Sequence, residues 1–130
     1  MNVPLVLVII NDTANRNLAA EVLEYAGYQV VEASTAAEGL RMVRQHQPST
    51  IVLDVFWLAD FDGMQLMRVL HNHPETRHIP IIAFASKYDW DELNGAGFAA
   101  LIDNPIDIDE LSQVIKEVAG DVRIAARERG

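Results

Sequence analysis

Four short runs rich in apolar residues, separated by segments with helical periodicity, constrain the fold of this chain most strongly. The runs cover residues 3–10, 30–33, 50–54 and 79–85, and a weaker fifth run covers residues 99–102. Strands that alternate apolar and polar residues leave one face in water, whereas continuously apolar strands are buried on both faces, as in a parallel sheet. The pattern therefore predicts central strands with a layer of helices on each side.

Boundary signals support the helical segments between these runs. One apolar stripe ends at Gly27, a natural residue after a helix C-terminus, and another begins after Ser34 or Thr35, both good N-cap residues. The last helix follows Pro105 and stops at Gly120. Alternation of strands and helices predicts an α/β fold, a flavodoxin-like (βα)5 doubly wound sheet of five parallel strands. The expected strand order is 2-1-3-4-5, in a three-layer sandwich.

Composition narrows the class of protein. The chain has 130 residues, enough for one domain; we expect residues 1–120 to form it and residues 121–130 to be a C-terminal helical extension or tail. It has no cysteine, and no apolar run approaches the roughly 20 residues needed to cross a bilayer. A net charge of −9 argues against nucleic acid or an anionic membrane as partner. We expect a cytoplasmic protein that is a monomer or weak homodimer.

Asp54 is the residue with the clearest chemical potential, because it ends the apolar run 50–54. Open α/β sheets bind ligands at the carboxyl ends of their strands, so an acid in this position is a candidate nucleophile or metal ligand. The predicted topology brings three other strand ends to the same edge, at Ile10-Asn11-Asp12, Ala85-Ser86 and Asn104-Pro105.

With these residues in place, the chain resembles the receiver domains of two-component response regulators over Val3–Val118. The segments that carry the resemblance are Asn15-Arg16 with Leu18, Gly27-Tyr28, Ile51-Val52-Leu53-Asp54, Asp62-Gly63-Met64, His78-Ile79-Pro80 and Asn104-Pro105-Ile106. The resemblance implies signalling by protein contact with a histidine kinase or another two-component protein, without enzymatic activity. It also implies that Asp54 matches an aspartate that accepts a phosphoryl group with the help of Mg²⁺.

The sequence departs from the family at most positions that support this chemistry. The family holds Mg²⁺ with a pair of acids after the first strand, and binds the phosphoryl oxygens with a hydroxyl after the fourth strand and a lysine before a proline. Here Ile10 and Asn11 occupy the acidic positions, Ala85 the hydroxyl position and Asn104 the lysine position. Without a cation, a carboxylate that attacks a phosphate meets unrelieved charge repulsion. We therefore interpret the chain as a stand-alone pseudo-receiver that acts by protein–protein interaction and needs no cofactor.

Two alternatives stay open. In the first, Asp54 is a working phospho-acceptor for a histidine kinase: a one-residue shift would make Asp12 a Mg²⁺ ligand beside Asp54, and Asp60 or Asp62 in the long loop could rebuild the site. In the second and more remote one, the protein is a small hydrolase or phosphotransferase that uses Asp54 as nucleophile. It is disfavoured because no second acid or base lies within a few residues of Asp54.

Three large aromatic residues stand near this edge. Trp57 lies in the loop after Asp54, and Tyr88 and Trp90 lie in the short segment after the fourth strand. Neither segment is well placed to bury three rings in the central core, and exposed aromatics are enriched at protein interfaces. They are candidates for a partner-binding surface, with rings folded over the vacated pocket as the alternative.

Overall fold

Every strand of the sheet runs parallel to its neighbours, in the order β2-β1-β3-β4-β5, so the predicted fold class is confirmed. The computed structural model describes residues 3–56, 58, 62–85 and 90–120. The strands are β1 (Leu5–Ile9), β2 (Gln29–Ala33), β3 (Thr50–Asp54), β4 (Ile81–Ala85) and β5 (Ala100–Asp103). The helices are α1 (Thr13–Tyr25), α2 (Ala36–His46), α3 (Gly63–Asn72), α4 (Trp90–Ala96) and α5 (Ile108–Ala119).

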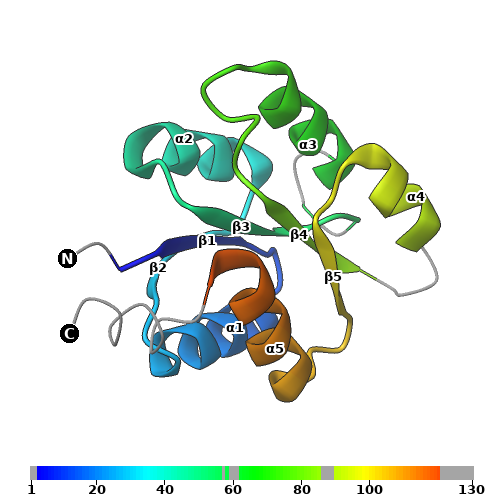
Figure 1. Cartoon of the computed structure of the whole chain (residues 1–130). Coiled ribbons are helices and arrows are strands. Elements are labelled where there is room, and N and C mark those ends of the chain that lie inside the picture. The colour runs from blue at the N-terminus through cyan, green and yellow to red at the C-terminus, as the bar shows by residue number, and fades with distance from the viewer. Residues whose placement is uncertain (1–2, 57, 59–61, 86–89, 121–130) are drawn as a thin grey trace.

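Helices cover both faces of the sheet, which separates the hydrophobic core into two layers (Figure 1). The first core lies between the sheet and α2, α3 and α4, and it includes Leu53 and Leu66. The second lies on the side of α1 and α5, and it includes Val52 and Leu111. Because adjacent residues of a strand point to opposite faces, β3 contributes to both cores and all five of its residues are buried. None of the described helices is long and apolar enough to cross a membrane.

Prolines explain why two strands are shorter than their apolar runs. The runs 3–10 and 79–85 contain β1 and β4, and each strand begins directly after a proline, Pro4 or Pro80. Proline has no N–H to donate to a neighbouring strand, so the two-sided hydrogen bonding of a central strand cannot extend through it. The proline carbonyl can still accept, and that of Pro80 accepts from the N–H of Ile51 at 3.1 Å.

Side-chain caps begin four of the described helices. Each cap is an oxygen that accepts a hydrogen bond from a backbone N–H in the first turn, where such donors have no partner within the helix. The cap residues are Asp12 for α1, Thr35 for α2, Asp62 for α3 and Asp107 for α5. The Glu38 carboxylate in the first turn of α2 also accepts a hydrogen bond from the N–H of Ser34, the residue before the cap, at 3.2 Å.

The side-chain hydroxyl of Thr50 is buried, and its Oγ1 has no hydrogen-bond partner among the described residues. An unpaired buried polar group is costly, and valine has nearly the same shape. We expect Thr50→Val to raise the free energy of unfolding by about 1 kcal/mol in a urea titration.

Thr76→Val is the matched control. The Thr76 hydroxyl donates to the carbonyl of Leu70 at 2.6 Å, so its removal should lower the free energy of unfolding by about 1 kcal/mol. Equal destabilisation by the two substitutions would show that the Thr50 hydroxyl has a partner after all.

Candidate functional site

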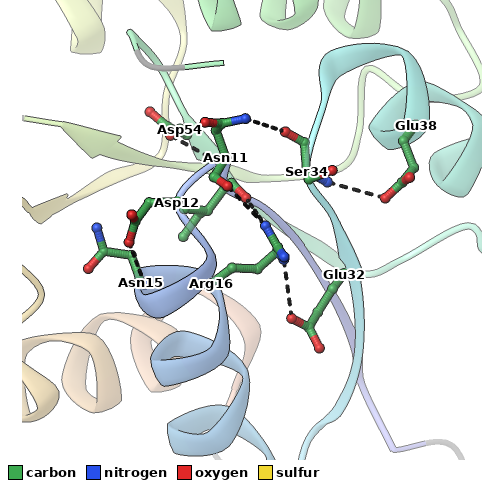
Figure 2. Close-up of polar contacts among 9 residues, drawn as sticks. Asn11, Asp12, Asn15, Arg16, Glu32, Ser34, Glu38 and Asp54 are labelled. Carbon is green, nitrogen blue, oxygen red and sulfur yellow. Dashed lines mark hydrogen bonds and ion pairs between the residues drawn. The ribbon is translucent and has the colours of Figure 1, made fainter. Parts of the chain in front are cut away.

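Asp54 lies at the end of β3 and is almost completely buried, with 1% of its surface exposed. A buried carboxylate requires hydrogen-bond donors, since it has lost its contact with water. One donor is the backbone N–H of Asn11, which lies 3.4 Å from Asp54 Oδ2 (Figure 2). Asn11 follows the neighbouring strand β1, so this bond joins the ends of two adjacent strands.

The two positions that correspond to the family's acidic pair have other surroundings here. Ile10 is fully buried in the second core, between the sheet and the layer of α1 and α5. The side-chain amide of Asn11 donates to the carbonyl of Ser34 at 3.3 Å, which connects the loop after β1 to the loop after β2. Neither side chain brings a negative charge to Asp54.

Asp12 is used as the cap of α1. Its Oδ2 accepts a hydrogen bond from the N–H of Asn15 at 2.8 Å, and Figure 2 shows the carboxylate turned toward Asn15 and away from Asp54. Asp62 has the same role in α3, where its Oδ1 accepts from the N–H of Met64 at 2.8 Å. The described part of the chain contains no group of at least three His, Cys, Asp or Glu residues that could hold a metal ion.

The residues at the ends of β4 and β5 that match the family's hydroxyl and lysine positions are neutral here. Ala85 is buried in the first core and has no hydroxyl to offer. Asn104 is exposed, its N–H donates to Asp103 Oδ1 at 3.1 Å, and a cis peptide bond joins it to Pro105. Asp60 and Ser86, two further candidates, lie outside the described residues.

Arg16 is a structural part of the site that the sequence did not predict. Its Nη1 donates to the carbonyl of Ile10 at 2.9 Å and to that of Asn11 at 3.1 Å, and its Nε lies 3.5 Å from Glu32 Oε1 (Figure 2). The guanidinium therefore fixes the backbone of the loop after β1 and is paired with Glu32. The sequence feature that could have indicated this contact is Glu32, an acid inside the otherwise apolar run 30–33.

Gly63 allows α3 to begin directly against the end of β3. A Cβ atom at this position would lie 2.5 Å from the carbonyl oxygen of Asp54 and 2.8 Å from Val55 Cα, well inside contact distance. Its N–H donates to the carbonyl of Val55 at 2.9 Å. The sequence indicated that a helix begins after Asp62-Gly63. Only the three-dimensional structure shows that position 63 has no room for a side chain.

The structure describes one of the three candidate interface aromatics. Trp90 begins α4 and is partly buried, packed against the first core. Trp57 and Tyr88 lie outside the described residues. Phe56, which sequence reasoning did not single out, is 45% exposed two residues after Asp54. An exposed aromatic side chain therefore does lie close to the buried acid.

The sequence is similar to one protein family and to a characterised member of it. Residues 6–116 match the family described as "Response regulator receiver domain". The polar-differentiation response regulator DivK of Brucella ovis is 30% identical over 119 residues, which cover 89% of this chain and 96% of that protein.

Solved structures share the fold. A CheY-like response regulator receiver domain protein from Methanospirillum hungatei superposes with a TM-score of 0.78 at 28% identity, covering 89% of this chain and 93% of that one. The chemotaxis response regulator CheY4 of Vibrio cholerae has a TM-score of 0.83 at 18% identity, over 90% and 99% of the two chains, and supports the fold alone.

The close contact at Gly63 predicts a position-specific effect of a methyl group. Gly63→Ala should lower the free energy of unfolding by about 2 kcal/mol or more, because the atoms it would meet belong to the backbone and cannot rotate away. Thermal and urea denaturation would measure the loss. The displaced strand end should also shift the NMR signal of the Asn11 amide, which is bonded to Asp54.

Gly95→Ala is the control. Gly95 lies in α4, and a Cβ there would meet nothing within 4 Å, so the substitution should be neutral or stabilising by up to about 1 kcal/mol. Similar stability changes in the two variants would refute the steric account of Gly63.

Proposed function

This chain belongs to the response regulator receiver domain family, and we propose that it signals by protein contact as a pseudo-receiver, without Mg²⁺-dependent phosphorylation of Asp54. The observation that carries the proposal is the neutral residue Asn11, whose N–H meets Asp54 at the position of a family acid. The proposed partner is a histidine kinase or another protein of a two-component system.

Charge is the physical basis of this proposal. Two unit charges about 4 Å apart interact by about 4 kcal/mol at the effective dielectric constant near a protein surface. A missing cation would therefore slow attack on a phosphate by about a thousandfold. The neutral side chains of Asn11 and Asn104 supply none of the charge that would assemble or stabilise the phosphorylated state.

The donor set also fits Mg²⁺ poorly. Mg²⁺ prefers octahedral oxygen ligands, commonly one or two carboxylates with water. Asp12 and Asp62 could turn toward Asp54 only by leaving the helix N-termini that they cap, at a cost of about 1 kcal/mol each. The Asn11 amide would likewise have to give up its bond to Ser34. We therefore expect function without a metal cofactor.

One observation favours the alternative of a working phospho-acceptor. Asp54 keeps the family position, buried at the end of the central strand β3. A carboxylate there could still react if Mg²⁺ were held by water and by residues outside the described part of the chain.

An NMR titration separates the two functions. The Asn11 amide is a local probe, because its proton points to the Asp54 carboxylate. With Mg²⁺ and then beryllofluoride, a phosphoryl analogue, we expect no saturable shift of this signal at millimolar concentrations. Asp54→Asn is the control, and it should leave the response to the additives unchanged.

A saturable shift in the natural sequence that disappears in Asp54→Asn would overturn the pseudo-receiver proposal in favour of the phospho-acceptor. Turnover of a chromogenic phosphate ester, lost in Asp54→Asn, would instead point to the hydrolase.

A further inference from the structure

Four of the six lysines and arginines in the described part of the chain lie on one side of the molecule. Arg41, Arg44, Arg68 and Arg77 all belong to α2, α3 or the loop after α3, and all four are exposed; we call this set the basic face. Outside it, the described residues contain two further lysines or arginines, which are Arg16 and Lys116. In Figure 1, α2 and α3 lie on the same side of the sheet, and the loop after α3 leads from that helix to β4.

The opposite helical layer is acidic. Exposed carboxylates on or next to α1 and α5 include Glu21, Glu24, Asp107, Asp109 and Glu117. Charge is therefore unevenly distributed over the described residues, with four of their six lysines and arginines in the other layer. Such segregation creates a local positive potential on a protein that repels anions as a whole.

None of the arginines of the basic face forms an ion pair with another described residue. Among the described residues, the recorded ion pair is that of Arg16 with Glu32, on another part of the surface. Three acids lie in the same segments as the basic face. Glu38 and Asp62 accept hydrogen bonds at helix N-termini, while Glu75 is exposed in the loop after α3. The guanidinium groups are thus available to an outside partner.

Two adjoining hollows give this face a shape. One has a volume of about 280 Å³ and the other about 320 Å³, and both are lined by Arg44, Glu75 and Thr76. Apolar side chains complete the walls, among them Val43 and Ile79 in the first, and Leu40 and Leu70 in the second. Residues that precede β3 and β4 line the first hollow, so it lies at the opposite edge of the sheet from Asp54.

We propose that the basic face binds an acidic protein segment in which carboxylates alternate with apolar residues. The carboxylates pair with exposed guanidinium groups, and the apolar side chains enter the two hollows. A protein segment fits better than nucleic acid, because the net charge of −9 repels a phosphate backbone and aliphatic side chains in both hollows, such as Val43 and Leu70, suit apolar residues. This binding surface would add a partner to the proposed function. It rests on that function only in one respect, that the protein signals by contact with other proteins.

Fluorescence anisotropy tests the proposal with a labelled peptide that alternates glutamate and leucine, added to the full chain without Mg²⁺. We expect saturable binding that weakens as salt is raised. Arg44→Gln should weaken binding about two- to fivefold, because one exposed charge pair is lost. Glu75→Gln should tighten binding by a similar factor, because it removes the acid that faces the ligand from the rim of both hollows.

Lys116→Gln is the charge-matched control, because Lys116 is exposed on α5 in the acidic layer. It should leave binding unchanged, as should Asp54→Asn, so the result does not depend on whether Asp54 can be phosphorylated. The proposal is overturned if the peptide does not bind, or if Lys116→Gln weakens binding as much as Arg44→Gln.

The proposal would also be overturned if the basic face bound a nucleic acid or a second copy of this chain. Tighter binding of an oligouridine RNA than of the peptide would assign the face to nucleic acid. Salt-sensitive self-association in sedimentation, lost in Arg44→Gln, would assign it to the acidic layer of a second copy.

Discussion

The central strand β3 is buried on both faces, and the rest of the molecule is arranged around that constraint. Its apolar residues reach both hydrophobic cores, and Asp54 at its end is left with almost no access to water. A carboxylate in that position must be satisfied by nearby backbone donors, and the N–H of Asn11 is one of them. The same burial brings α3 so close to the strand end that Gly63 has no room for a side chain.

The side chains of the loop after β1 make structural contacts. Asn11 bonds to Ser34, Asp12 caps α1, and Arg16 holds the carbonyls of Ile10 and Asn11 while it pairs with Glu32. Each contact stabilises the geometry around Asp54 without bringing a second carboxylate to it. The side chains of this loop therefore connect the loops that surround Asp54 at the same edge of the sheet.

The sequence was sufficient for the features that depend on local chemistry. The apolar runs predicted parallel strands, Thr35 was one of two candidate caps for its helix, and Asp54 was identified as a strand-end acid. Contacts between distant segments were not accessible in the same way: Asn11 meets Ser34 across 23 positions and Asp54 across 43. The steric role of Gly63 and the pairing of Arg16 with Glu32 were missed for the same reason. Segregation of arginines onto one layer likewise required knowing which helices share a side of the sheet.

The central claim is that a neutral residue at position 11 deprives Asp54 of a metal partner, and calorimetric titration with Mg²⁺ tests it most directly. The natural sequence should give no saturable heat at millimolar Mg²⁺, whereas Asn11→Asp should bind at least about tenfold more tightly, because it supplies a second carboxylate beside Asp54. Without metal, that variant should melt at a lower temperature, since the new carboxylate repels the buried carboxylate of Asp54, and Mg²⁺ should restore its stability. Equal Mg²⁺ affinity of the natural sequence and Asn11→Asp would contradict the account.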